Sequence, residues 1–378
     1  MNPLQGLQEY GQSVWLDYIR RDLLENGELR RLITDDGLRG MTSNPAIFEK
    51  AIADSALYDA AFAAVPKHHA DTKALYELVA IHDIQAAADI LRSVYDATQR
   101  RDGYVSLEVS PYLAHDTDKT LVEARRLWTA VGRENVMIKV PGTPEGIPAI
   151  EQLISEGLNI NVTLLFAREV YERVAQAFIA GLEKRAAAGK DVGHVASVAS
   201  FFISRIDTLI DSQLSERLKN AAGAERGRLE SLLGKVAIAN GKLTYERYGA
   251  IFSGPRWEKL QRQGAQTQRV LWASTSTKNP AYRDVLYVEE LIGSDTVNTI
   301  PPATFDAFRD HGRLRQTLTE NVAAAQQTMD TLGQVGISMQ EVTAQLLDDG
   351  VRLFADAFDK LLTAVEQKSA TVANRASA

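Results

Sequence analysis

The sequence predicts an α/β protein in which eight parallel strands, each followed by helical sequence, close into a (β/α)8 barrel. Three observations support this fold class. Eight short β-branched or apolar runs each end in a polar residue and lead through a turn into a segment with helical periodicity. The first run is not followed by G-x-G-x-x-G, and G-x-x-x-x-G-K-S/T occurs nowhere, which disfavours an open doubly wound sheet. The 378 residues also fit a barrel of about 250 residues enlarged by insertions.

The eight runs are the predicted strands. They lie at residues 13–17, 38–44, 104–109, 135–140, 159–166, 194–200, 269–274 and 296–300. Parallel neighbours need a long crossover connection, and the helical segment after each run supplies it.

Helix start signals stand on both sides of the fourth predicted strand. Before this strand, either Asp116 or Thr117 is expected to cap a crossover helix. After it, Thr143 is expected to cap a helix whose first position is Pro144.

Two stretches are too long for one crossover helix. Residues 45–101 and 205–263 each contain several helical patterns, so we predict helical insertions there. Residues 339–366 are predicted to form one long amphipathic helix. Because no repeat and no Pro/Ser-rich linker divides the chain, we expect one barrel domain over residues 1–368 and a polar tail at 369–378.

The composition excludes several kinds of site. The 42 Lys and Arg against 49 Asp and Glu give a net charge of −7, which offers no global positive field to a nucleic acid. The chain has no Cys, so disulfides, thiolate nucleophiles and zinc–thiolate or iron–sulfur sites are excluded. The 6 His include no i, i+4 pair. We expect no metal site and no bound cofactor.

The N-terminal segment, residues 1–31, lacks the basic start and apolar middle of a secretory signal. No run of about 18 apolar residues is present, as a transmembrane helix would require. We expect a cytoplasmic protein that binds neither nucleic acid nor membrane, as a monomer or a homodimer.

The carboxyl ends of the predicted strands carry the candidate reactive residues. In a barrel these ends gather at one face, where active sites lie. The residues are Asp17, Thr42, Asn44, Glu108, Lys139, Asn161, Thr163, Ser197, Ser200 and Ser274. An amine, two carboxylates, two amides and several hydroxyls are typical of a reaction centre rather than of a core.

Lys139 is the sharpest of these signals. The run V-M-I-K-V places an ammonium among apolar residues, where burying a charge is expensive. The cost falls if the amine is partly neutral, and a neutral amine can attack a carbonyl to form a Schiff base. The alternative is a side chain that points outward or pairs with a carboxylate.

The other candidates have structural alternatives. Asp17 can instead cap the following helix, and Glu108 can lie on a solvent-facing strand surface or pair with a basic residue. Asn44 precedes a proline and is by default a turn residue. Asn161 and Thr163 are two residues apart and share a strand face, so if one lines the barrel mouth both do.

Taken together, these segments resemble the transaldolase family nearly end to end. The matching segments are W-L-D at 15–17, M-T-S-N-P at 41–45, S-L-E-V at 106–109, I-K-V-P-G-T-P-E-G at 138–146, N-I-N-V-T-L-L-F at 159–166, A-S-F-F-I-S-R-I-D at 199–207 and W-A-S-T-S-T-K-N-P at 272–280. The T-S-N-P, lysine-strand and N-V-T-L-L-F segments are together specific to that family.

The resemblance implies that Lys139 forms a Schiff base, that Asp17 is the general acid and base, and that Glu108 with Thr163 manages a catalytic water. The substrate-binding residues that it implies are Thr42, Asn44, Asn161, Ser200, Arg205, Ser274 and Lys278. Among these, Asn44 and Asn161 are expected to hydrogen-bond the substrate hydroxyls. Ser200 and Arg205 are expected to bind the substrate phosphate.

Arg205 is expected one helical turn after the sixth strand, near a helix N-terminus whose N–H groups favour an anion. The alternative is a surface arginine paired with Asp207. The second phosphate cation departs from the family pattern, because this chain offers Lys278 where shorter members carry an arginine at a different offset.

The implied reaction belongs to the pentose phosphate pathway and needs no cofactor. It transfers a dihydroxyacetone unit from fructose 6-phosphate or sedoheptulose 7-phosphate to erythrose 4-phosphate or glyceraldehyde 3-phosphate. Three alternatives stay open: a Schiff-base aldolase that releases dihydroxyacetone, a sugar-phosphate-binding protein without chemistry, and an interaction protein built on its helices.

Overall fold

Eight strands form a closed parallel barrel in sequence order, with β1 hydrogen-bonded to β8, within the residues that the computed structural model describes, 2–65 and 71–375. The strands are β1 (Gln12–Asp17), β2 (Gly40–Thr42), β3 (Tyr104–Glu108), β4 (Val136–Pro141), β5 (Ile160–Leu165), β6 (Ser197–Phe202), β7 (Arg269–Ala273) and β8 (Thr296–Ile300). The predicted (β/α)8 barrel is confirmed.

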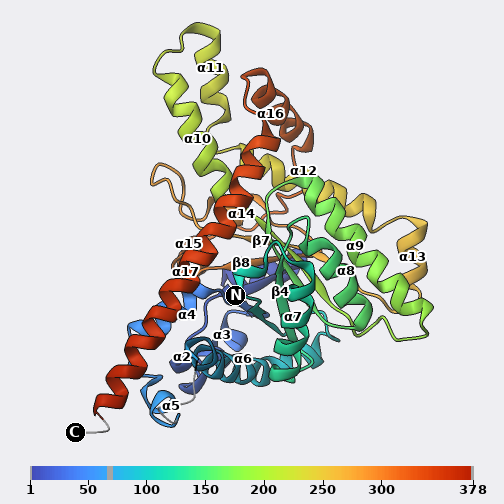
Figure 1. Cartoon of the computed structure of the whole chain (residues 1–378). Helices are drawn as coiled ribbons and strands as arrows, with labels where there is room; N and C mark the ends of the chain where they lie inside the picture. The colour runs from blue at the N-terminus through green and yellow to red at the C-terminus, as the bar shows by residue number, and fades with distance from the viewer. Residues whose placement is uncertain (1, 66–70, 376–378) are drawn as a thin grey trace.

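Helices surround the barrel and fill the long connections (Figure 1). Up to β4 they are α1 (Pro3–Gly6), η1 (Leu7–Tyr10), α2 (Arg21–Glu25), α3 (Glu28–Asp35), α4 (Pro45–Ala53), α5 (Asp59–Ala63), α6 (Thr72–Ala97), η2 (Pro111–Leu113) and α7 (Thr117–Val131). Beyond β4 they are α8 (Gly146–Glu156), α9 (Arg168–Ala187), α10 (Ser204–Leu218), α11 (Gly223–Leu232), α12 (Val236–Ile251), α13 (Pro255–Gln261), α14 (Leu286–Glu290), α15 (Pro302–His311), α16 (Val322–Gln334) and α17 (Met339–Arg375).

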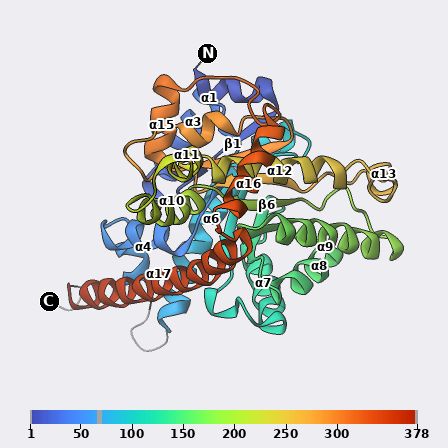
Figure 2. The same ribbon diagram turned by 90° about the horizontal axis from the view of Figure 1, so that it is seen from above.

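The C-terminal helix α17 is the longest element and crosses the outside of the barrel. Figures 1 and 2 show it in red, running from the region of α10 past α4 toward α5, and it packs against these helices and against β5. It continues beyond Glu366 to Arg375, so part of the segment that the sequence assigns to a polar tail is helical.

The second strand, β2, covers only Gly40–Thr42 of the predicted residues 38–44. The residues at the two ends of this run form hydrogen bonds that terminate neighbouring helices. The backbone N–H of Leu38 donates to the carbonyl of Leu32 and closes the end of α3. At the other end, Asn44 caps α4, accepting a hydrogen bond from the backbone N–H of Ile47 at 3.0 Å. The sixth strand begins later than predicted and ends later, at Phe202.

The predicted helix caps are confirmed in part. Asp116 caps α7 by accepting a hydrogen bond from the backbone N–H of Lys119 at 2.9 Å. The hydroxyl oxygen of Thr143 accepts from the N–H of Gly146 at 3.0 Å. Because α8 begins at Gly146, Pro144 lies in the turn before the helix, and its prediction as the first helical residue is wrong.

Strand register aligns the reactive residues across the barrel. Glu108 of β3 is paired with Lys139 of β4, which is paired in turn with Asn161 of β5. Cα partners in adjacent strands share a face, so these three side chains point together into the barrel. The alternate positions Ile138 and Val140 are fully buried on the helical side, as expected when both faces of a parallel sheet are covered.

In the part of the chain that the structure describes, none of the helices combines the length and the apolar character needed to cross a bilayer.

Candidate active site

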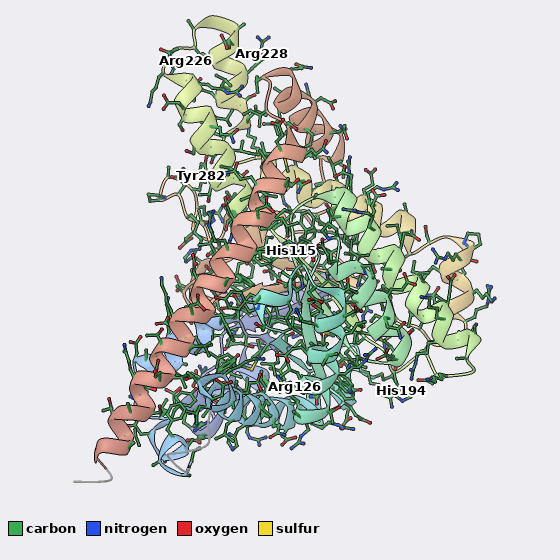
Figure 3. All side chains as sticks on the ribbon, in the orientation of Figure 1. His115, Arg126, His194, Arg226, Arg228 and Tyr282 are labelled. Atoms are coloured by element: carbon green, nitrogen blue, oxygen red, sulfur yellow. The ribbon has the colours of Figure 1, made fainter. Side chains whose placement is uncertain are left out.

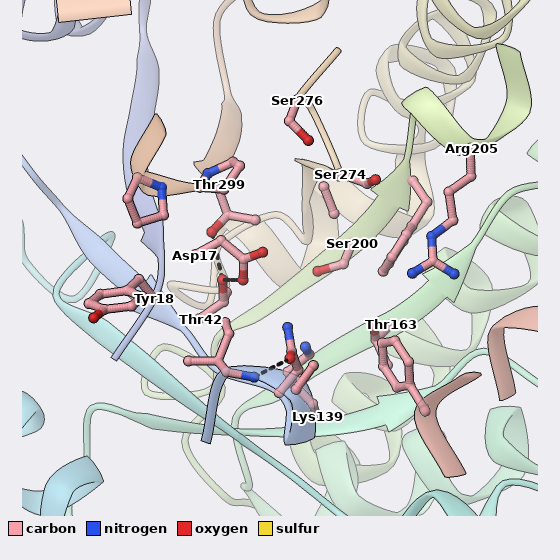
Figure 4. A pocket seen from close by; sticks show the side chains of 18 of the residues that line it. Asp17, Tyr18, Thr42, Lys139, Thr163, Ser200, Arg205, Ser274, Ser276 and Thr299 are labelled. Carbon is pink, nitrogen blue, oxygen red and sulfur yellow. Dashed lines mark hydrogen bonds between the residues drawn. The ribbon is translucent and has the colours of Figure 1, made fainter. Parts of the chain in front are cut away.

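A cavity of about 740 Å³ opens at the carboxyl ends of the strands (Figure 4). Its lining contains every predicted site residue except Glu108, Asn161 and Ser197. The prediction that Ser197 lies at a carboxyl strand end is wrong, because this residue begins β6 and its hydroxyl donates to the carbonyl of Ile160. In Figure 4, Asp17 and Arg205 lie on opposite sides of the view, with Lys139 at the base and Ser200 between them. The strand ends therefore bring an amine, a carboxylate and a guanidinium to one pocket.

Lys139 lies at the base of this pocket and is almost completely enclosed. Its Nζ donates a hydrogen bond to the backbone carbonyl of Ser43 at 3.0 Å and lies 3.5 Å from Oε2 of Glu108. Phe354 of α17 covers it, with the ring centroid 6.0 Å from Nζ. The outward-facing alternative for Lys139 is wrong, and the carboxylate partner lies inside the barrel.

Glu108 lies behind Lys139 rather than on the pocket surface. Its side chain is only 5% exposed, and neither carboxylate oxygen has a hydrogen-bond partner among the described residues. Burial raises the pKa of Glu108, the nearby Lys139 ammonium opposes this effect, and the Asp17 carboxylate adds to it. A raised pKa makes the carboxylate a stronger base, which suits Glu108 to proton transfer.

Thr163 lines the pocket next to an irregular position in β5. Its side chain is fully buried and its Oγ1 has no hydrogen-bond partner in the described part of the chain. The pairing of β5 with β6 shifts register between Val162 and Leu165, and Leu164 has a φ of 60°. Left-handed backbone is strained for leucine, and such bulges occur next to active sites, where they redirect a side chain. The N-V-T-L-L-F motif contains no glycine that would signal this bulge.

Asp17 is held in place by a chain of hydroxyl groups. The Thr42 hydroxyl donates to Oδ1 of Asp17 at 2.7 Å, and the oxygens of Thr42 and Thr299 are 2.6 Å apart. The surrounding protein removes most of the water around Asp17, and this desolvation raises its pKa, although the Lys139 ammonium acts in the opposite direction. Asp17 does not cap the following helix, because the N-cap of α2 is Arg20. This alternative for Asp17 is therefore wrong.

Two asparagines lie on either side of Lys139 but differ in exposure. Asn44 lines the pocket while its side-chain oxygen caps α4, which leaves its amide N–H₂ group available to a ligand. Asn161 is fully buried, donates to the Ser106 hydroxyl at 3.0 Å and accepts from the Ser200 hydroxyl at 2.6 Å. Asn161 thus connects the base of the barrel to the pocket wall.

Arg205 faces the pocket from the first turn of α10. It lies three residues after the end of β6 and is the second residue of α10, so its predicted position about one helical turn after the strand, near a helix N-terminus, is confirmed. The guanidinium is half-buried over the ring of Phe202, at 5.7 Å, and has no carboxylate partner among the residues described. Desolvation lowers the pKa of Arg205. The alternative pairing fails because Asp207 accepts its hydrogen bonds from Ala237 and Tyr287 instead.

The connection after β7 adds polar groups to the same side of the pocket. Lys278 stands at the exposed rim and donates to the Ser276 hydroxyl at 2.6 Å. Desolvation lowers the pKa of Lys278, and the Arg205 charge adds to this effect. Ser274 has a φ of 55°, and its hydroxyl lies 3.0 Å from that of Ser204.

Sequence reasoning missed several contributors to the pocket. They are Tyr18, Ser43, Lys50, Ser276, Thr299 and Phe354. Thr299 stands near the end of the last strand and could have been found by the same rule as the others. Phe354 lies in a helix far along the chain, and no local signal points to it. In residues 2–65 and 71–375, no group of three His, Asp or Glu side chains is arranged to hold a metal ion.

Comparison with known proteins gives one consistent result. Residues 14–365 match the family model described as Transaldolase/Fructose-6-phosphate aldolase. A protein from Trichodesmium erythraeum named Transaldolase is 49% identical, and the match covers 97% of each chain. Proteins of the same name from Thermobifida fusca and Neisseria gonorrhoeae are 45% and 44% identical, over 98% and 96% of this chain and 99% of each relative. The chain belongs to the transaldolase/fructose-6-phosphate aldolase family.

Proposed function

We propose that this protein is a transaldolase, a transferase that moves a dihydroxyacetone unit from a ketose phosphate to an aldose phosphate. Fructose 6-phosphate or sedoheptulose 7-phosphate would be the donor, and erythrose 4-phosphate or glyceraldehyde 3-phosphate the acceptor. The observation that carries the proposal is the buried Lys139 amine, 3.5 Å from the Glu108 carboxylate in a pocket that also contains Asp17.

The first step is imine formation at Lys139. The unprotonated Nζ attacks the donor ketone, and loss of water from the adduct gives a cationic imine. Glu108 supplies and removes the protons through a water held with Thr163. The buried oxygens of both side chains support this assignment, since neither side chain has a hydrogen-bond partner among the described residues and buried polar atoms are normally hydrogen-bonded.

The second step breaks the C3–C4 bond. Asp17 takes the proton of the C4 hydroxyl, the bonding electrons flow into the cationic imine, and the aldose product leaves an enamine on Lys139. The raised pKa of Asp17 supports its role as the base. Because Thr42 binds Oδ1 of this carboxylate, Oδ2 is the oxygen proposed to take the C4 proton. An acceptor aldehyde then reverses these steps.

Substrate binding divides between hydroxyl and phosphate contacts. The free amide group of Asn44 and the remaining amide hydrogen of Asn161 are suited to the hydroxyls of the three-carbon fragment. Arg205 is suited to the phosphate, because a guanidinium without a carboxylate partner can grip two phosphate oxygens. Lys278 adds a second positive charge at the rim.

The family name includes an aldolase, so release of free dihydroxyacetone is the competing function. The two differ in the fate of the enamine, which is protonated by water in an aldolase and captured by an aldose in a transaldolase. Assaying the donor with and without erythrose 4-phosphate distinguishes them. Turnover that depends on the acceptor supports the transaldolase, and equal turnover in its absence supports the aldolase.

Borohydride trapping tests the chemistry itself. Reduction with fructose 6-phosphate should label Lys139, as mapped by peptide mass spectrometry, and Lys139→Ala should abolish both label and transfer. Lys50 lines the same pocket, so Lys50→Ala is the matched control and should keep the label. A label on Lys50 or on any other lysine would remove Lys139 from the mechanism.

A further inference from the structure

Two aspartates on α10 lie outside the reaction chemistry yet accept four hydrogen bonds. Oδ1 of Asp207 accepts from the backbone N–H of Ala237 at 2.7 Å, and Oδ2 accepts from the Tyr287 hydroxyl at 3.0 Å. Oδ1 of Asp211 accepts from the backbone N–H of Gly234 at 3.1 Å, and Oδ2 accepts from the Tyr282 hydroxyl at 2.7 Å. The two aspartates are one helical turn apart, so they present one face.

These contacts join the two segments that carry the pocket cations. Arg205 precedes Asp207 by two residues on α10, whereas Lys278 precedes Tyr282 in the connection after β7. Figure 3 labels Tyr282 beside the base of α10, in agreement with its hydrogen bond to Asp211. We call the four side chains Asp207, Asp211, Tyr282 and Tyr287 the Asp–Tyr clasp.

Gly234 lies against the clasp in a backbone conformation that favours glycine. Gly234 has a φ of 69°, and a Cβ at this position would lie 2.8 Å from the ring of Tyr282. A side chain here would therefore strain the backbone and push the tyrosine ring away. The backbone N–H of Gly234 also donates to Asp211. The turn at Gly234 therefore contacts both the Tyr282 ring and the Asp211 carboxylate.

Arg205 and Lys278 repel each other, and the clasp can oppose this repulsion. Arg205 and Lys278 are positively charged, face one pocket, and interact closely enough for Arg205 to lower the pKa of Lys278. Without an anion, this repulsion disfavours a close spacing of the two side chains. Among the described residues, neither cation forms an ion pair with a carboxylate, although the Asp17 carboxylate attracts Lys278 from a greater distance.

We propose that the Asp–Tyr clasp is a positioning device that holds Arg205 and Lys278 at the spacing needed for a substrate phosphate. The inference rests on the proposed function for the identity of the substrate. The clasp residues do not line the pocket, so we expect them to contact neither the reacting carbons nor the phosphate. They act by fixing α10 to the connection after β7 before the anion arrives, so that binding does not have to order these segments.

The test uses Tyr282→Phe, which removes one hydroxyl from a half-buried ring and keeps the ring itself. Loss of one such hydrogen bond should raise KM for fructose 6-phosphate by about two- to tenfold. The value of kcat, and kcat/KM for unphosphorylated fructose, should not change. Tyr245→Phe is the matched control, because its hydroxyl donates to the carbonyl of Ser294, and it should leave all of these constants unchanged.

Two further measurements separate positioning from general stability. In a background that carries Arg205→Ala and Lys278→Ala, Tyr282→Phe should have no further effect on KM, since its effect acts through those cations. If Tyr282→Phe raises KM equally in both backgrounds, or penalises both donors equally, the clasp is structural and the proposal is wrong. Tyr287→Phe gives a second, independent variant with the same expectation.

Inorganic phosphate gives a readout that does not depend on catalysis. It should raise the Tm of the wild-type protein, and the phosphate concentration for half of this shift should increase about two- to tenfold in Tyr282→Phe. If Tyr282→Phe weakens phosphate binding as expected but the wild-type protein transfers no carbon unit, the proposed function fails and the clasp stands. An unchanged phosphate response in Tyr282→Phe would overturn the clasp while leaving the transaldolase proposal intact.

Discussion

Nζ of Lys139 lies 3.5 Å from Oε2 of Glu108 in the interior of the barrel, and both side chains are at least 94% buried, with exposures of 6% and 5%. The two residues are direct neighbours in the β3–β4 register. Proton exchange between them therefore requires no backbone motion. In the proposed mechanism, this contact makes Glu108 the group that controls imine formation.

Glu108→Gln should slow imine formation, because the amide keeps the shape of the side chain and cannot take a proton. A general acid or base typically contributes about 10²- to 10⁴-fold to the rate. Single-turnover borohydride trapping with fructose 6-phosphate measures this step directly. A trapping rate equal to that of the wild-type protein would contradict the role of Glu108.

Asp17→Asn should have the opposite pattern. The imine should still form and be trapped on Lys139, whereas turnover should fall by about 10²- to 10⁴-fold because the C4 proton has no acceptor. Thr42 can still donate to the new side-chain oxygen, so the pocket should keep its shape. Near wild-type turnover would assign the C4 proton to another group.

Arg205→Ala should raise KM for phosphorylated donors more than it lowers kcat, since the phosphate is remote from the reacting carbons. Loss of a charge-assisted contact corresponds to about 1.5 to 3 kcal/mol in kcat/KM. Comparison of fructose 6-phosphate with unphosphorylated fructose checks the assignment. An equal loss for both donors would place Arg205 in folding or in the chemistry.

Asp207 should make the protein less stable as pH rises. Burial, with Asp211 adding to it, raises the pKa of Asp207 from 3.8 to about 7. A carboxyl group with a raised folded-state pKa binds its proton more tightly in the folded state, so its contribution to stability is fully present below about pH 4 and is lost as pH rises to about 7.

Asp207→Asn removes this titration while the amide can still accept from Ala237. The variant's free energy of unfolding, measured by denaturant titration between these two pH values, should fall less than that of the wild-type protein. Parallel curves for the two proteins would show that Asp207 does not titrate in this range.

The sequence predicted those site residues that stand at the ends of the strands, because the apolar runs that form the strands can be recognised locally. A polar residue that ends an apolar run must lie at the barrel mouth once the strands are parallel, and this rule located Asp17, Lys139 and Thr163. It could not separate Asn161, which is fully buried against Ser106 and Ser200, from residues that line the pocket. That distinction depends on depth in the barrel, which the register of neighbouring strands determines.

Contacts between segments that are distant in the sequence could not be predicted either, because they do not follow from local pattern. The bulge at Leu164 has no glycine to mark it, and Phe354 reaches Lys139 from a helix that pattern reasoning identified only as amphipathic. The end of β6 was placed too early, because the strand extends to Phe202, beyond the residues whose pattern indicated a strand. In each case long-range packing decides the geometry, and the local sequence does not record it.

The last prediction concerns Gly350 of α17, which faces the bulge residue Leu164 of β5. A Cβ at position 350 would lie 3.0 Å from Cδ2 of Leu164, so a side chain as large as leucine would crowd Leu164 and disturb the packing of the helix on the bulge. Leu164 is next to Thr163 in sequence, and Phe354 is one helical turn beyond Gly350, so both the proposed water site and the cover over Lys139 should be disturbed.

Gly350→Leu should therefore lower both kcat/KM and Tm, even though leucine favours a helix over glycine by about 0.8 to 1 kcal/mol, because overpacking typically costs about 1 to 3 kcal/mol. Gly333 of α16 is the matched control, since nothing lies within 4 Å of the position its Cβ would occupy. Gly333→Leu should keep full activity and the same or a higher Tm. If Gly350→Leu also keeps wild-type kcat/KM, then close packing of α17 on β5 does not shape the active site, and the cover that Phe354 provides has no catalytic consequence.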